Sequence, residues 1–118
     1  PTLVVMGKGL HPLVFPHGTD MSADMDALLA AYRAALPGVP LLWRTQYVSL
    51  VDTNGHVGNQ IIDFNKVARE KVAAFGGTIL DGEMIGLFAP LPCDYHCPEL
   101  VNSVAVQSVL NHLALMSQ

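Results

Sequence analysis

Three short apolar runs alternate with three helix-like segments, and this alternation limits the folds open to the chain. The runs lie near residues 2–7, 40–49 and 77–81. The first of them, Leu3 to Met6, is continuously apolar, which suits a strand buried on both faces of a sheet. Strands separated by helices are typical of a parallel sheet that helices cover. The sequence therefore predicts a three-layer α/β/α fold with parallel strands joined by right-handed crossovers.

The segments between the runs have the spacing of helices. Apolar residues recur three and four positions apart over residues 20–36 and 58–75, and Pro37-Gly38 and Gly76-Gly77 follow as stop signals. Asp20 or Ser22 can cap the first helix. A loop is expected over residues 81–97, and a final helix from Pro98. The final helix is predicted to be largely buried because it is rich in apolar residues: Leu100, Val101, Val104, Val106, Val109, Leu110, Leu113 and Leu115.

Length and charge narrow the class of protein. A chain of 118 residues, 51% of them hydrophobic, suffices for one modest core, so we expect one domain or part of one. Six scattered basic residues against ten acidic ones predict no nucleic-acid partner. No apolar stretch approaches the roughly 20 residues that span a bilayer. An apolar run begins almost directly after Pro1. We interpret this as a chain whose N-terminal part is missing; the alternative is removal of an initiator Met before the proline.

The candidate catalytic and ligand-binding residues are sought in the segments that follow the predicted strands, because ligands bind beyond the carboxyl ends of parallel strands. His96 is the strongest candidate for general base, with Asp94 two residues before it. A histidine takes a proton from a hydroxyl nucleophile near neutral pH, and a carboxylate holds its tautomer. The alternative is a loop histidine with a structural role or none.

Four segments carry a resemblance to a known family. They are residues 3–11 (LVVMGKGLH), 42–45 (LWRT), 58–68 (GNQIIDFNKVA) and 93–98 (CDYHCP). In this order they resemble the PC-esterase group of SGNH acyl-esterases, which includes plant polysaccharide O-acetyltransferases and the C-terminal domain of neurexophilin-like proteins. The resemblance implies an SGNH or flavodoxin-like α/β domain of which residues 1–118 form the C-terminal portion.

The resemblance also implies an activity, hydrolysis or transfer of an acyl group on an acylated carbohydrate or similar ester. His96 would be the base, oriented by Asp94 or Asp81. The family's Gly-Asp-Ser nucleophile motif is absent here. A companion segment or subunit would therefore supply the serine, and the chemistry needs no cofactor.

Three residues would handle the substrate in this reading. Gly9 or His11 would bind the oxyanion. Arg44 would hold an acyl carboxylate or a sugar hydroxyl. The rival hypothesis is a catalytically inactive SGNH-like subunit or interaction module of a larger assembly.

The block around His96 departs from the family, which separates its Asp and His by two residues. Here only Tyr95 intervenes. Cys93 and Cys97 are candidates for a disulfide, which the resemblance to a secretory or extracellular group favours. Ordinary buried thiols are an alternative, and so is a zinc site completed through space by another histidine. The histidines available for that fourth position are His11, His17 and His56.

Overall fold

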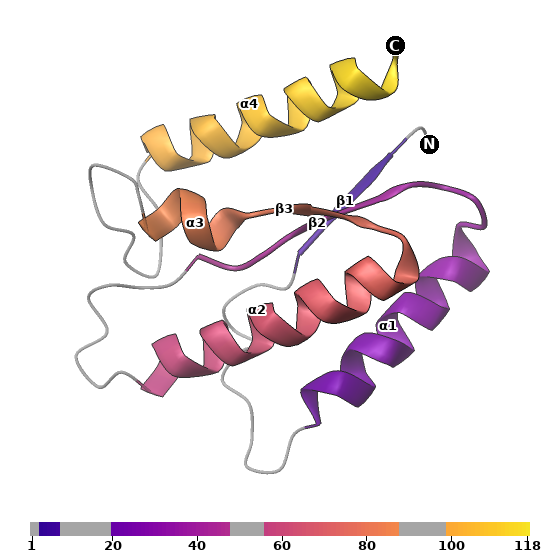
Figure 1. The fold of residues 1–118 in the computed structure, drawn as a ribbon, viewed down its shortest axis with the longest axis vertical. Helices are drawn as coiled ribbons and strands as arrows, with labels where there is room; N and C mark the ends of the chain where they lie inside the picture. The colour runs from indigo at the N-terminus through magenta and orange to yellow at the C-terminus, as the bar shows by residue number, and fades with distance from the viewer. Residues whose placement is uncertain (1–2, 8–19, 48–55, 88–98) are drawn as a thin grey trace.

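The computed structural model describes residues 3–7, 20–47, 56–87 and 99–118 (Figure 1). The elements follow in the order β1 (Val4–Met6), α1 (Met21–Ala35), β2 (Leu41–Arg44), α2 (His56–Phe75), β3 (Thr78–Leu80), α3 (Gly82–Leu87) and α4 (Glu99–Met116). This is a mixed α/β fold.

The three strands form one sheet in the order β1-β2-β3, and both pairs are parallel, as predicted. Val4 lies opposite Leu41, and Leu42 lies opposite Thr78. The second strand is shorter than the predicted residues 40–49. The N–H of Thr45 still donates to Leu80 O at 3.0 Å. After Leu80 the chain turns into α3, so β3 offers no strand partner to the residues that follow Thr45.

Helices α1 and α2 pack together on one face of the sheet (Figure 1). Leu41 and Trp43 of the central strand lie in this core with Met25 of α1 and Phe64 of α2. Leu42, between them in sequence, is also buried. β2 is therefore covered on both faces, as its continuous apolar sequence requires.

Helix α4 lies over the opposite face, where Val5 and Leu80 of the strands line a cavity of about 210 Å³ together with Ala105 and Val109 of α4. The prediction that this helix is largely buried is wrong for its described part. Val106 and Leu110 are 59% and 52% exposed. A helix packed against one face of a sheet is covered on one side only, and α4 contacts β3 and α3, so its far side stays open. No described helix is both long and apolar enough to cross a membrane.

Two capping features behave as the sequence predicts. Asp20 is the N-cap of α1, and its side chain accepts from Ala23 N at 3.0 Å. Gly38 and Gly76 follow α1 and α2 with φ of 74° and 92°, a region that favours glycine.

Helix α3 was not predicted, because its residues were expected to belong to a loop. Asp81 caps it by accepting from Met84 N at 3.0 Å, and Ile85 N donates to Asp81 O at 3.1 Å. An aspartate three residues before an apolar pair is a recognisable start signal.

The open flank of α4 and the outer edge of β1, where Val5 is 46% exposed, predict that the isolated chain associates. Val106→Lys should lower the associated fraction in sedimentation velocity, since it places a charge on the apolar flank. Gln107→Lys, one position along on exposed surface, is the matched control and should change little. A monodisperse, cooperatively melting monomer of the unaltered chain would contradict this prediction.

Candidate functional site

A cluster of polar side chains lies where β2 and β3 end, at the carboxyl edge of the sheet. We call it the carboxyl-edge cluster and define it as Thr45, Asn65, Arg69, Asp81 and Glu83. Thr45 and Asp81 directly follow their strands, Asn65 and Arg69 lie one turn apart on α2, and Glu83 is in α3. Parallel strands bring these positions together because their carboxyl ends meet at one edge.

Asn65 fixes α2 against the end of β2. Its side chain is fully buried, Oδ1 accepts from Gln46 N at 2.8 Å, and Nδ2 donates to Gln46 O at 2.8 Å. Nδ2 also donates to Glu83 Oε2 at 3.0 Å. The amide thus replaces the strand partner that the backbone of Gln46 lacks, which satisfies two buried backbone groups.

Arg69 joins the two carboxylates of the cluster. Its Nη2 lies 2.9 Å from Asp81 Oδ1 and 2.9 Å from Glu83 Oε2. Partial burial lowers the pKa of Arg69, but its hydrogen bonds to Asp81 and Glu83 and their negative charges raise it more, and the net shift is upward. Arg69 therefore remains cationic, and the cluster carries two negative charges against one positive charge when both carboxyl groups are ionised.

Thr45 and Gly82 hold the turn after β3 close to the end of β2. Thr45 Oγ1 donates to Asp81 Oδ1 at 3.3 Å and accepts from Glu83 N at 3.1 Å. A Cβ on Gly82 would lie 2.3 Å from Thr45 O, so only glycine fits without a backbone shift.

The structure gives Asp81, predicted as a possible partner of His96, three other contacts. Its Oδ1 accepts from Thr45 Oγ1, Arg69 Nη2 and Met84 N. These contacts cap α3 and tie it to β2 and α2. Sequence reasoning missed Asn65 and Arg69 as members of this site, although two polar residues one turn apart on a helix that faces a sheet were a usable signal.

Arg44, the predicted substrate-binding residue, ends β2 on the face that α4 covers. Its guanidinium carbon lies 4.9 Å from the centroid of the Tyr47 ring, and both residues line the 210 Å³ cavity with Val5 and Val106. Arg44 therefore lies apart from the hydrogen bonds of the carboxyl-edge cluster. Its stacking on Tyr47 is a cation–π contact.

The remaining predicted site residues lie outside the described residues: Gly9, His11, Cys93, Asp94, His96 and Cys97. Their roles in catalysis, oxyanion binding, a disulfide or a zinc site stay predictions. Among the described side chains, no three or more His, Cys, Asp or Glu gather as metal ligands would.

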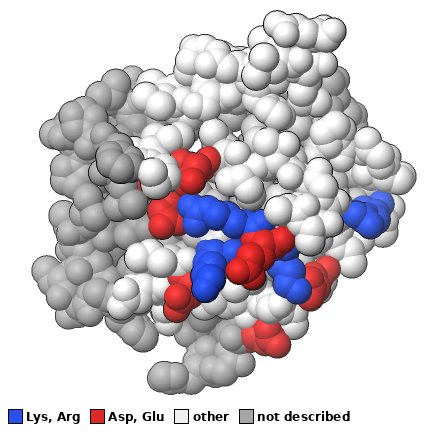
Figure 2. Space-filling view, in the orientation of Figure 1, with Lys and Arg blue, Asp and Glu red and all other residues white. Residues whose placement is uncertain are grey.

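Charge is mixed on the face where α1 and α2 are exposed. Figure 2 shows basic and acidic side chains interleaved there. Lys71 of α2 pairs with Asp26 of α1 at 2.8 Å, and Arg69 pairs with its two carboxylates nearby. This face therefore presents no extended patch of one sign.

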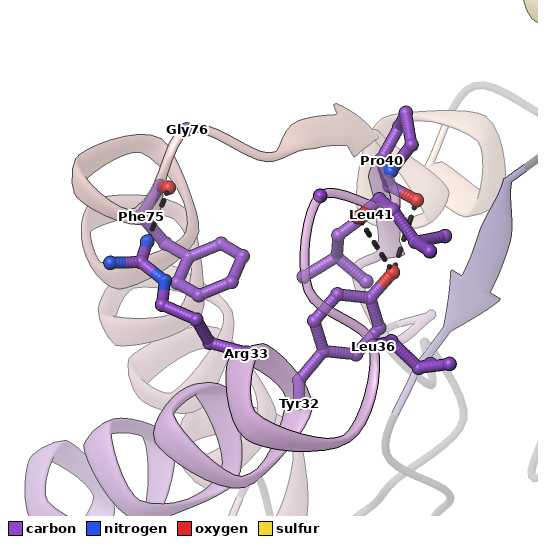
Figure 3. Close-up of a pocket in the computed structure, with 9 residues that line it drawn as sticks. Tyr32, Arg33, Leu36, Pro40, Leu41, Phe75 and Gly76 are labelled. Carbon is purple, nitrogen blue, oxygen red and sulfur yellow. Dashed lines mark hydrogen bonds between the residues drawn. The ribbon is translucent and has the colours of Figure 1, made fainter.

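A second cavity, of about 370 Å³, opens at the opposite end of the sheet (Figure 3). Tyr32 Oη is 3.1 Å from both Val39 O and Pro40 O. Arg33 donates to Phe75 O at 3.2 Å and stacks on the Phe75 ring at 4.3 Å. These polar groups are engaged with the protein itself, so we assign this region to joining the ends of α1 and α2 to β2.

Comparison with known proteins supports the fold only. No family model and no curated protein matches the chain. It is similar to the crystal structure of a protein from Lactobacillus plantarum, with a TM-score of 0.64 and 16% identity, over 94% of this chain and 67% of that one. At this identity the likeness supports an α/β arrangement and leaves function open.

The carboxyl-edge cluster should matter for stability more than an exposed ion pair does. We expect Arg69→Met to lower the free energy of unfolding by about 2 kcal/mol, because it leaves Asp81 and the mostly buried Glu83 without their cation. Lys71→Met is the matched control on the same helix, and its exposed pair should cost below about 1 kcal/mol. Urea unfolding of both variants checks this, and equal losses would contradict it.

Proposed function

We propose that this chain is the histidine-bearing part of an SGNH-type acyl-ester hydrolase or O-acyltransferase that acts on an acylated carbohydrate or similar ester. The observation that carries the proposal is the position of the resembling segments. Residues 3–11 begin in the region of β1, residues 42–45 include the end of β2, and residues 58–68 lie in α2. These are the strand, strand and helix that the resemblance implies for them.

In the proposed reaction, a serine from a companion segment attacks the acyl carbonyl carbon. His96 takes the serine proton and returns it to the departing alkoxide, and water or an acceptor hydroxyl then releases the acyl group by the same steps in reverse order. Gly9 or His11 stabilises the oxyanion. We assign the orienting role to Asp94 before Asp81, because Asp81 Oδ1 already accepts three hydrogen bonds.

The companion segment is proposed to lie beside β1. Two features support this position: β1 is an edge strand, and Val5 on it is about as exposed as the apolar flank of α4. An added strand would pair with β1 and cover that flank. The similar Lactobacillus plantarum structure is longer than this chain, since the chain covers 67% of it.

The first test is turnover of para-nitrophenyl acetate by the assembled protein. His96→Ala should lower kcat/KM by roughly 10³-fold or more, as losses within a triad do. His112→Ala, a histidine in α4 outside the resembling segments, is the control and should leave turnover unchanged. Esterase activity that survives His96→Ala would contradict the proposed base.

The second test separates the two aspartates. Asp81→Asn should lower the melting temperature, because it weakens the pairing with Arg69, and should leave kcat comparatively intact. Asp94→Asn should lower kcat with little effect on melting, because the imidazolium loses its carboxylate. Kinetics and thermal unfolding of both variants check this, and the reverse pattern would reassign the orienting role to Asp81.

A catalytically inactive subunit is the second candidate. The observation that favours it is the carboxyl-edge cluster, whose side chains bond to one another and to the backbone. If the assembled protein has no serine, cysteine or threonine within hydrogen-bond reach of His96, the structural role holds and the enzymatic one is wrong.

A further inference from the structure

We propose that the cavity between α4 and the sheet binds a short-chain monocarboxylate, with Arg44 holding the carboxylate and aliphatic side chains holding the tail. The cavity measures about 210 Å³. Pockets for drug-sized ligands have roughly 300–1,000 Å³, so this one suits a ligand of only a few carbons. Arg44 and Tyr47 line it together with five aliphatic residues: Val5, Leu80, Ala105, Val106 and Val109.

Arg44 differs from the other described arginines because it has no acceptor. Arg33 donates to Phe75 O, and Arg69 donates to two carboxylates. Arg44 makes no ion pair or hydrogen bond with any residue that the structure describes, and its one such contact is with the Tyr47 ring. Helix α4 offers no side-chain carboxylate either, since residues 100–118 contain no Asp or Glu. A half-buried guanidinium without an acceptor is unfavourable, and an anion in the cavity would remove that cost.

The guanidinium of Arg44 is open to a ligand in this cavity. Its Cζ lies 4.9 Å from the centroid of the Tyr47 ring, which also lines the cavity. A Cβ built at Gly7 would lie 3.6 Å from Arg44 Nε, so the group also borders the carboxyl end of β1, where glycine has no side chain to cover it. Arg44 is half-buried, and none of its unpartnered nitrogens is fully buried. An acceptor that enters the cavity can therefore reach these nitrogens.

The geometry of a guanidinium selects a carboxylate among anions and polar groups. Its forked N–H donors match the two oxygens of a carboxylate. Stacking on Tyr47 restricts the guanidinium before a ligand arrives, which lowers the entropy cost of binding. A sugar hydroxyl brings one oxygen and no charge, so of the two ligands predicted for Arg44 the carboxylate fits better. Inorganic phosphate would lose its strong hydration to apolar walls and a single arginine.

The rest of the described lining selects an apolar tail. Val5 and Val106 are 46% and 59% exposed, and an alkyl chain laid between them would take part of that surface from water. Each methylene group buried in this way should tighten binding by up to about fourfold. A second polar group on the tail would lose its hydration without gaining a partner among these aliphatic side chains. The ligand is therefore a monocarboxylate.

This proposal does not rest on the proposed esterase activity. The cavity includes none of the residues assigned to catalysis or to the oxyanion. Asp81 and Glu83 do not line it, and Arg69 pairs with both, so their charges should repel a bound anion only weakly. Binding can therefore be measured on protein that shows no turnover.

The experiment measures binding of sodium hexanoate to the purified full chain by saturation-transfer difference NMR. Hexanoate should bind saturably, and hexan-1-ol, which has the same chain without the charge, should bind at least about tenfold more weakly. Butanoate, two methylene groups shorter, should bind more weakly by up to about fifteenfold. Inorganic phosphate should not displace hexanoate. No saturable binding, equal affinity for hexanoate and hexan-1-ol, or displacement by equimolar phosphate would each overturn the proposal.

Two pairs of variants locate the site. Arg44→Met should weaken hexanoate binding by at least about tenfold, and Arg33→Met, which also removes an arginine stacked on an aromatic ring, is the matched control. Val109→Phe should fill the cavity and weaken binding to a similar extent. Leu113→Phe is its control, because Leu113 lies one turn further along α4, is also half-buried and does not line the cavity. Equal binding by a test variant and its control would contradict the assignment.

Thermal unfolding separates a ligand site from a structural arginine. Arg44→Met should leave the melting temperature unchanged or raise it, because the variant removes a half-buried charge that has no partner among the described residues. A lower melting temperature would mean that Arg44 pairs with a carboxylate of the protein itself, and this would overturn the proposal.

Discussion

Burial of the central strand β2 on both faces is the constraint on which the rest of the structure depends. Leu41 and Trp43 pack against α1 and α2, while Leu42 points to the other face and is equally buried. Each such side chain contributes on the order of 1.5–3 kcal/mol when removed from water. β1 and β3 have only three residues each, so their positions depend on hydrogen bonds to this strand.

The same strand determines where polar groups gather. β2 ends at Arg44, and the backbone of the next residues needs hydrogen-bond partners in a buried environment. Asn65 satisfies Gln46, while Thr45 and Arg69 fix the turn that starts α3. Satisfied networks of this kind are rigid but leave few groups free for chemistry. Reactive groups must then come from residues beyond this cluster.

Parts of this arrangement follow from sequence pattern because they depend on local chemistry. The strand at Leu3 to Met6, the helical spacing and the glycines at 38 and 76 each require only their neighbours to be interpreted, and these elements are confirmed. The predicted burial of that first strand on both faces is wrong, because β1 lies at the edge of the sheet and Val5 is 46% exposed. Helix α3 was missed because the whole of residues 81–97 was expected to be a loop, although Asp81 caps the helix.

The parts that sequence could not supply depend on distances between segments remote in sequence. Nothing local to Arg69 indicates that Asp81 and Glu83 will meet its guanidinium. Nor does the composition of α4 show how much of it a sheet of three strands can cover, which is why its burial was overestimated. The roles of Asp94 and His96 rest on resemblance and remain predictions.

Helices cover the two faces of the sheet to different extents. On one face α1 and α2 enclose a continuous core, and their charges pair at its surface. On the other face α4 contacts β3 and α3, while Val5 and Val106 remain open toward β1. An apolar surface beside an unpaired strand edge is unfavourable in water and favours strand addition. A partner that pairs with β1 would also widen the carboxyl edge of the sheet. Assembly at this edge would therefore both stabilise the fold and bring new side chains to the end of the sheet where ligands bind.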